Sequence, residues 1–273
     1  MNTRNIVAKM LSSTATKALS LARHLDNPEL MRLRKRGLPR ECYQSLNRQW
    51  LRSLDPRTIL DIGANTGQFA VAANAIFTGA AVYSFEPLPD WFETLKKNMS
   101  GVKEFRAFNI GLGAAHAELQ FNRSSFAPSS SFRKMATLHK ETYPWTAGSE
   151  TVDVQVETLD CVTAAFDLKD PILLKIDVQG YEDQVLAGGK SICSRAAVII
   201  IEISFETLYE GQPLFDDIYR TLISWGFAYK GSLEQAVDPK SDRYLYADAI
   251  FLRMGASQAD PAALACGRAK LCG

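Results

Sequence analysis

The sequence lacks an excess of charge of either sign. Its 273 residues carry 31 Lys and Arg against 30 Asp and Glu, which leaves a net charge of +1 at pH 7. So weak a field gives no reason to expect nucleic acid or an anionic membrane as the main partner. Long apolar runs are also absent: residues 196–203 fall far short of the roughly 20 residues that span a bilayer. We therefore expect no integral membrane segment.

Cysteine is scarce and unpatterned. The five cysteines are an odd number and show no metal-finger spacing, and they stand at positions 42, 161, 193, 266 and 272. This pattern favours buried thiols in a reducing compartment and a cytoplasmic location. A crosslink between Cys266 and Cys272 is the lesser alternative.

Acidic residues are missing from the first 25 positions, where basic residues alternate with Leu, Val, Ala, Ser and Thr. This composition fits a plain basic leading helix or an amphipathic transit peptide, and we favour the helix. No continuous apolar core in this segment suits a secretory signal.

An alternation of strand and helix patterns begins near residue 55. Short apolar strands separated by helical segments of about 10–15 residues predict an α/β fold with a parallel sheet covered on both faces. We expect strands at 58–63, 81–87, 104–113, 172–177, 197–204 and 246–253. We expect helices at 69–77, 91–99, 181–189 and 216–226.

Two segments between the third and fourth of these strands have a different pattern. Residues 118–122 and 151–159 alternate apolar and polar side chains, as half-exposed strands do. The mostly polar residues 124–150 between them predict a long loop, which in a compact domain is usually functional or disordered. The chain as a whole divides into an N-terminal helical extension (1–54), a main domain (55–253) and a flexible C-terminal tail (254–273).

The segment DIGANTG, residues 61–67, indicates a ligand-binding turn after the first strand. Glycines let the backbone approach a ligand closely, and the start of a helix offers N–H groups without intrahelical partners. A glycine-rich turn without a ligand explains this segment equally well by itself. Glu86 favours the ligand, because it ends the second strand 19 residues after Gly67, the spacing at which an acid binds a ribose diol.

The dinucleotide fingerprint is incomplete at this turn. Asn65 and Gln68 stand at the second and third glycine positions of G-x-G-x-x-G, so a pyrophosphate is poorly provided for. S-adenosylmethionine has a ribose but no phosphate, and backbone N–H groups of the turn suit its amino acid end. The residues favour S-adenosylmethionine as the cofactor, with NAD second.

A series of segments in a fixed order is typical of one family. The segments are LDIGANTGQFA, YSFEPLPDWFETL, SSSF, VQVETLD, LLKIDVQGYEDQVLAGG, IEISFETLYEGQPLF, GFAYKG and YADAIFLR. From about residue 40 to about residue 253, the chain resembles an FkbM-type S-adenosylmethionine-dependent methyltransferase.

The resemblance implies a class I methyltransferase fold and O-methylation, often in glycan or secondary-metabolite assembly. The implied fold is a Rossmann-like, mostly parallel seven-stranded sheet with its last strand antiparallel, helices on both faces and a β-hairpin or loop insertion after the third strand. Glu86 would hold the ribose, and Ile110 and Gly111 would flank the adenine. The implied cofactor-binding residues are Asp61, Gly63, Ala64, Asn65, Gly67, Glu86, Pro87, Ile110 and Gly111.

Methyl transfer to a hydroxyl needs an acceptor oxygen in line with the leaving sulfur, and a base helps. Asp177 ends the fourth strand beside the expected cofactor site, and Lys175 points to the same face. We expect Asp177 to accept the proton or orient the hydroxyl, and Lys175 to fix its charge. A structural ion pair is the alternative, and for Lys175 it is equally well supported. His139 in the long loop is a second candidate base, acting from a lid, unless it is an exposed loop residue.

Other carboxylates belong to the same end of the sheet. Glu202 is a lone acid in an apolar strand and needs a partner, and we expect it at the acceptor pocket. Glu182 begins a helix, where the helix dipole alone favours an acid. Asp177, Glu202 and Asp248 are oxygen donors of the kind that bind Mg²⁺, but no spacing argues for a metal and we expect none.

The sequence thus predicts an S-adenosylmethionine-dependent O-methyltransferase acting on a saccharide or secondary-metabolite intermediate. An NAD-dependent oxidoreductase and a non-catalytic nucleoside-binding scaffold are the alternatives. The expected partner is a small-molecule or glycan acceptor, and the N-terminal helices are candidates for a homodimer contact or for a lid over the pocket.

Overall fold

The fold is described from a computed structural model, which covers residues 32–255. The basic leading segment, nearly all of the C-terminal tail and the last two cysteines lie outside the described residues. The boundaries expected at residues 54 and 253 remain predictions.

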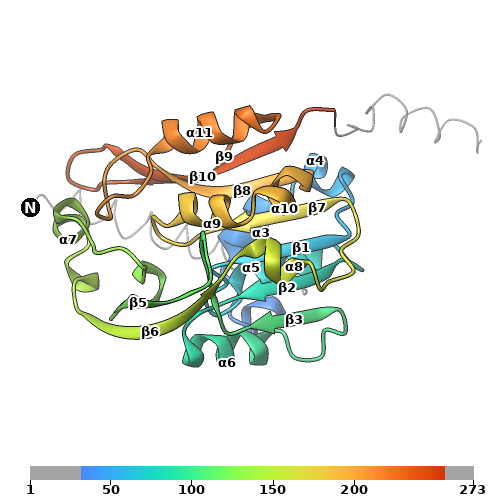
Figure 1. Cartoon of the computed structure of the whole chain (residues 1–273), viewed down its shortest axis with the longest axis horizontal. Helices are drawn as coiled ribbons and strands as arrows, with labels where there is room; N and C mark the ends of the chain where they lie inside the picture. Colours follow the sequence, from blue (N-terminus) through green and yellow to red (C-terminus); the bar gives the residue numbers. More distant parts are fainter. Residues whose placement is uncertain (1–31, 256–273) are drawn as a thin grey trace, which may run out of the picture.

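Seven strands form the main sheet in the order β3-β2-β1-β7-β8-β10-β9 (Figure 1). Strands β1, β2, β3, β7 and β8 pair in parallel, and β10 is antiparallel to both of its neighbours. This is the class I methyltransferase topology, so the predicted fold class is confirmed. The strands are β1 (Thr58–Ile62), β2 (Ala81–Phe85), β3 (Phe105–Phe108), β7 (Ile172–Ile176), β8 (Val198–Ser204), β9 (Phe227–Val237) and β10 (Tyr244–Arg253).

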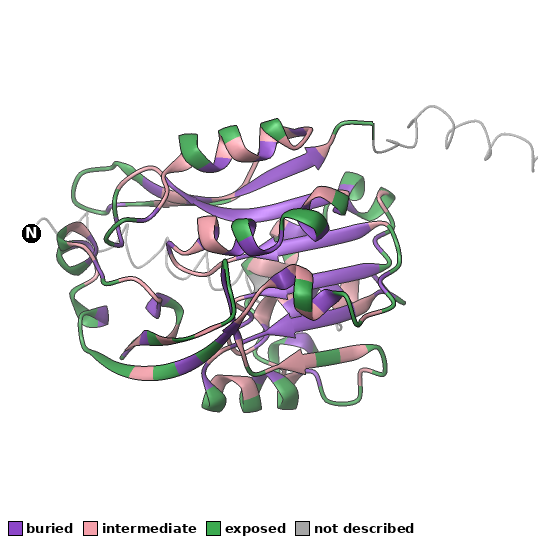
Figure 2. Ribbon diagram, viewed as in Figure 1, coloured by how far each residue is buried: buried purple, intermediate pink, exposed green. Residues whose placement is uncertain are grey.

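Helices cover both faces because the central strands are apolar on both sides, as the buried strands in Figure 2 show. One face packs against α3 (Arg40–Leu46), α4 (Gln49–Ser53), α5 (Gln68–Ile76) and α6 (Pro89–Asn98). The other packs against α8 (Leu159–Thr163), α9 (Glu182–Gly188), α10 (Lys190–Arg195) and α11 (Phe215–Ser224). In β7, Ile172, Leu174 and Ile176 face the second layer, and Leu173 faces the first. Lys175 follows Leu173 by two residues and therefore points to the α3–α6 face.

The insertion after β3 is more ordered than its polar composition indicates. Strands β4 (Gly111–Leu112), β6 (Ser149–Glu157) and β5 (Ala117–Ser124) form a second sheet in that order. The expected loop at 124–150 contains α7 (Thr137–Thr142) between two 3₁₀ turns, η1 (Ala127–Ser129) and η2 (Pro144–Thr146). Its serines 129–131 are buried, because their hydroxyls and backbone groups bond to neighbouring segments. We call residues 111–157 the insertion.

Two strands depart from the pattern-based prediction. The expected strand at 104–113 divides into β3 and β4, which belong to different sheets. Strand β9 is not predicted by the apolar pattern, because it is an edge strand whose residues are mostly polar or half-exposed. An edge strand has one neighbour and a largely solvated face, so little apolar periodicity is required of it.

Within residues 32–255, no helix combines the length and apolar character needed to cross a bilayer. The cysteines described there are unpaired thiols. Cys193 is buried as expected, whereas Cys161 is exposed on α8, which corrects the expectation that the thiols are buried.

Candidate active site

A cavity of about 260 Å³ opens at the carboxyl ends of the central strands. Nearly every residue predicted to bind the cofactor lines it, and so do Lys175 and Asp177. The predicted cofactor-binding residues in its wall are Asp61, Gly63, Ala64, Asn65, Glu86, Pro87, Ile110 and Gly111. The fold therefore brings together side chains that lie more than a hundred residues apart in sequence.

Gly67 is the exception among the predicted cofactor-binding residues. It precedes α5 in the left-handed region, with φ of 91°, and a Cβ on it would lie 2.7 Å from Leu95 Cδ1. Its conformation and its contact with α6 explain the glycine without a ligand.

The turn after β1 is held against β2 by its backbone. Gly63 N and Ala64 N both donate to the carbonyl oxygen of Phe85, at 3.1 and 3.0 Å. Gly63 and Asn65 both adopt left-handed conformations, with φ of 79° and 49°. Asn65 is stabilised there by its own side chain, which accepts a hydrogen bond from Thr66 N at 2.7 Å.

Glu86 lies buried between this turn and the start of α6. One carboxylate oxygen accepts from Asn65 N at 2.8 Å and the other from Leu88 N at 2.9 Å. Burial raises the pKa of Glu86 to about 7, although these two hydrogen bonds lower it. Asp61, in β1, is also buried, and burial raises its pKa to about 7 against a hydrogen bond donated by Ser84 Oγ at 3.1 Å.

One part of the cavity wall is apolar. Phe121 and Phe132 of the insertion line it together with Ile110 and Gly111. A Cβ on Gly111 would lie 2.6 Å from Phe132 Cζ, so this glycine lets an aromatic ring approach the backbone.

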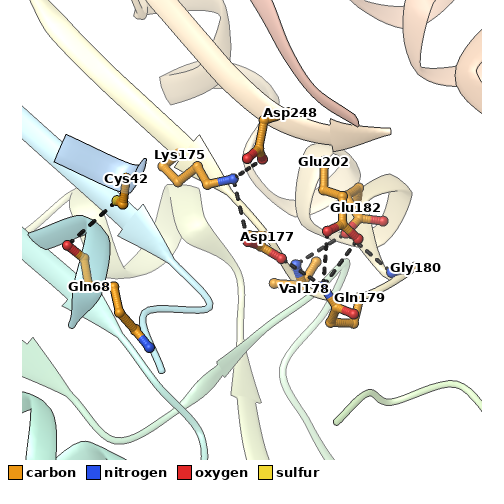
Figure 3. A network of polar contacts seen from close by, with 10 residues as sticks. All are labelled: Cys42, Gln68, Lys175, Asp177, Val178, Gln179, Gly180, Glu182, Glu202 and Asp248. Atoms are coloured by element: carbon orange, nitrogen blue, oxygen red, sulfur yellow. Dashed lines mark hydrogen bonds and ion pairs between the residues drawn. The ribbon is translucent and has the colours of Figure 1, made fainter. Parts of the chain in front are cut away.

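Lys175 is the centre of a group of charged side chains in another part of the cavity wall. Its ammonium pairs with Asp248 of β10 and, at 3.4 Å, with Asp177 (Figure 3). Burial by itself lowers the pKa of Lys175, but Asp248 and Asp177 outweigh burial and the pKa is raised. The sequence predicted the pair with Asp177. The ion pair with Asp248 follows only from the order of strands in the sheet, which places β10 beside β8.

Two further acids stand behind Asp177. Glu202 of β8 is buried and accepts hydrogen bonds from Gln179 Nε2 at 3.1 Å to each of its oxygens. Glu182 is buried as well and accepts from Val178 N at 3.1 Å and Gly180 N at 3.2 Å. Glu182 therefore fixes the turn after β7, which is a more specific role than the helix-dipole preference expected from sequence. Neither acid is among the residues that line the cavity.

His139 is not brought to the cavity. It is 3% exposed in α7 and packs edge-to-face against Tyr143 and Tyr209, with ring centroids 5.4 and 5.0 Å away. Both ring nitrogens are buried without a hydrogen-bond partner, and burial lowers the pKa of His139 to about 4. The loop that was expected to carry it as a lid is folded around it, so the structure places this candidate base in a packing role, neither exposed nor facing the acceptor.

Helix α3 forms one wall of the cavity. Cys42, Ser45 and Leu46 line it, and so do Leu233 and Glu234 of the neighbouring strand β9. The described end of the N-terminal extension thus lines the same cavity as Lys175, and its roles as a lid or as a homodimer contact remain predictions. Within residues 32–255, no group of three or more His, Cys, Asp or Glu side chains is arranged to hold a metal ion.

Comparisons with known proteins show the family of this chain. The model of the methyltransferase FkbM domain matches residues 61–229. The 2-O-methyltransferase NoeI of Sinorhizobium fredii is 30% identical over 165 residues, which are 58% of this chain and 67% of that protein. The hexuronic acid methyltransferase AglP of Haloferax volcanii is 27% identical over 144 residues, 52% of this chain and 54% of that protein.

Among solved structures, the methyltransferase FkbM of Methylobacillus flagellatus aligns with a TM-score of 0.46 and 13% identity, over 72% of this chain and 44% of that chain. The chain thus matches between about half and two thirds of the length of the two curated relatives. The matched family model covers more than half of the 273 residues and includes the turn after β1, Glu86 and the Lys175–Asp177 segment. The chain belongs to the FkbM methyltransferase family.

Proposed function

We propose that this protein is an S-adenosylmethionine-dependent methyltransferase that methylates a hydroxyl group, on a saccharide or a secondary-metabolite intermediate. One observation carries the proposal. A single cavity is lined both by the turn after β1 with Glu86, which suit a nucleoside, and by Asp177, which suits an acceptor hydroxyl.

The residues present fit the nucleoside part of this cofactor. Each oxygen of Glu86 accepts one backbone N–H and keeps a lone pair for a ribose hydroxyl. Ile110, Phe121 and Phe132 give the cavity an apolar wall, which suits a flat base. Among the described lining residues, Lys175 is the only basic one, and the surrounding carboxylates suit a positively charged sulfonium.

When bound, the cofactor supplies an electrophilic methyl group on its sulfonium. The protein's own residues must then hold the acceptor hydroxyl and take its proton. Asp177 lines the cavity with its side chain about a third exposed, at 35%, so a hydroxyl can reach it. Lys175 is held by Asp248 and also faces the carboxylate of Asp177 at 3.4 Å, so its ammonium helps to hold that carboxylate in place.

The acceptor class is supported by family membership and by the names of the relatives. One relative is described as a 2-O-methyltransferase and another as a hexuronic acid methyltransferase. Both descriptions are consistent with a hydroxylated acceptor, and the second with a sugar. An NAD-dependent oxidoreductase is disfavoured, because the turn has Asn65 where the dinucleotide fingerprint has its second glycine.

Calorimetry with S-adenosylhomocysteine tests the cofactor. The wild type should bind it, and Glu86→Ala should bind at least about tenfold more weakly, since a buried charge-assisted contact is removed. Glu93→Ala is the matched control, because Glu93 is an exposed acid on α6 paired with Lys96. If the wild type binds no S-adenosylhomocysteine and instead changes the fluorescence of NADH in a titration, the protein is better explained as an NAD-dependent oxidoreductase.

Transfer of a tritiated methyl group to methyl glucoside and methyl glucuronide tests the reaction on one neutral and one acidic sugar. Asp177→Ala should retain S-adenosylhomocysteine binding and lose transfer by on the order of 10²-fold or more. Asp153→Ala, an exposed acid on β6, is the control. Turnover of Asp177→Ala close to that of the wild type would remove Asp177 from the chemistry.

A further inference from the structure

The turn between β7 and α9 contains Gln179, a residue held in an unusual backbone conformation. Its φ is 55°, in the left-handed region that non-glycine residues seldom adopt. Ser131 Oγ donates to its carbonyl oxygen at 2.6 Å, and Glu182 accepts from the N–H groups of Val178 and Gly180 on either side. The backbone is therefore fixed from two directions, which sets where the side chain of Gln179 points.

The side-chain amide of Gln179 joins three other side chains, and Figure 3 shows two of them. Its nitrogen donates to Asp177 Oδ1 at 2.9 Å and to both oxygens of Glu202 at 3.1 Å. Its oxygen accepts from the hydroxyl of Tyr209 at 3.0 Å. A flipped amide would turn its oxygen toward two carboxylates, so the chemistry of the neighbours determines this orientation.

Tyr209 connects this amide to the insertion. Tyr209 is 2% exposed, and the carbonyl oxygen of Ser129, 3.1 Å from its hydroxyl, shares the hydroxyl proton with the amide oxygen of Gln179. A Cβ on Gly180 would lie 3.0 Å from Tyr209 Cβ, so the turn and the tyrosine are in close contact. The amide of Gln179 thus has little freedom to move away from Asp177.

The consequence for Asp177 is a fixed carboxylate. One oxygen accepts from Gln179 Nε2 and the other faces Lys175 Nζ at 3.4 Å. Without the amide, Asp177 and the buried Glu202 would stand near each other with no donor between them, at a place where burial and Asp177 already raise the pKa of Glu202. The amide both separates the two acids and aims one of them into the cavity.

We propose that Gln179 is a positioning residue for methyl transfer, which holds the Asp177 carboxylate in the orientation that meets the acceptor hydroxyl. This inference rests on the proposed function, in which Asp177 handles the acceptor. A residue that only shapes the turn is the competing explanation. It would be expected to change stability and cofactor binding together and to leave the orientation of Asp177 unchanged.

The main variant is Gln179→Met, which keeps the length of the side chain and removes its hydrogen bonds. Gln184→Met on α9 is the matched control, because Gln184 Nε2 also donates to an aspartate, Asp183, at 2.9 Å. Crystal structures of both variants and of the wild type give the first readout. We expect the Asp177 carboxylate to rotate or lose a single position in Gln179→Met alone, and an unchanged Asp177 there would overturn the inference.

Kinetics give the second readout, using whichever of methyl glucoside and methyl glucuronide the wild type methylates. Gln179→Met should lower kcat by on the order of 10- to 100-fold with little change in S-adenosylhomocysteine affinity. Gln179→Glu replaces the donor amide by a carboxyl group beside Asp177 and Glu202, so it should lower kcat at least as strongly, again with little change in S-adenosylhomocysteine affinity. Equal losses of binding and kcat would favour the turn-shaping role.

Tyr209→Phe serves if Gln179→Met does not fold. It leaves Gln179 in place but removes the donor that orients its amide, so we expect a smaller change of Asp177 in the same direction. If the wild type binds no S-adenosylhomocysteine, the proposed function fails by itself, and the orientation of Asp177 in crystals without ligand still decides whether Gln179 positions it.

Discussion

Gly63 and Asp177 pack backbone against backbone at the carboxyl ends of β1 and β7. A Cβ on Gly63 would lie 1.9 Å from the carbonyl oxygen of Asp177, a distance that no side chain tolerates. Asp177 N also donates to the carbonyl oxygen of Ile62 at 3.0 Å. The turn that suits the cofactor and the acid that suits the acceptor are therefore fixed relative to each other by the main chain.

Substitution of Gly63 tests this contact. Gly63→Ala should lower the free energy of unfolding by about 2–4 kcal/mol, because it adds both a left-handed non-glycine residue and a backbone clash. Gly79→Ala is the control, since Gly79 has φ of 91° and nothing within 4 Å of the added Cβ. Its cost should be about 1 kcal/mol. Urea denaturation measures both, and equal costs would show that the contact with Asp177 is unimportant.

The Lys175–Asp248 pair predicts strong coupling between two strands that are far apart in sequence. Lys175→Met should destabilise the protein by roughly 2–4 kcal/mol, because it leaves acids at the strand ends without their cation. Asp248→Leu in the Lys175→Met background should cost less than it does in the wild type. A double-mutant cycle measured by urea denaturation gives the coupling energy. Simple additivity of the two changes would contradict a direct pair.

Glu86 predicts that nucleoside binding depends on pH. Burial raises its pKa to about 7, so the carboxylate form that accepts ribose hydroxyls is lost as pH falls through that value. The affinity for adenosine should fall about tenfold between pH 8 and pH 6. Calorimetry at several pH values in this range measures the affinity. The Glu86→Gln variant should bind adenosine weakly, and its affinity should not depend on pH. The family resemblance implies that Asp61 lines the amino acid end of the cofactor, which adenosine lacks, so Asp61→Asn should keep the pH dependence of adenosine binding.

His139 predicts a loss of stability in acid. Its pKa is lowered by burial to about 4, so the folded protein favours the neutral ring. The stability that the neutral His139 ring contributes to the fold is fully present above the unfolded pKa of about 6.5. It is lost progressively as pH falls toward 4. His139→Phe replaces two unpaired nitrogens by carbon and should narrow the difference in Tm between pH 7.5 and pH 5.5. Methyl transfer should survive this change, and its loss in a folded variant would restore His139 as the base.

The expected fold was predictable because its signals are local. Segments 58–63, 81–87, 172–177 and 197–204 are buried on both sides, and such strands must be apolar along their whole length. Edge strand β9 and the folded interior of residues 124–150 carry weaker signals, since polar side chains there are satisfied by hydrogen bonds to distant segments.

The sequence by itself determined the fold class, the family and part of the cavity wall, because glycine turns and strand-end acids have fixed spacings within one strand–helix unit. Only the tertiary structure decided the partners of the charged groups. Asp248 reaches Lys175, and Glu202 reaches Gln179, because the sheet order places β8 beside β7 and β10 beside β8. It also decided that His139 is packed away from the cavity. Contacts between strands depend on topology, and no local pattern encodes which distant strand becomes a neighbour.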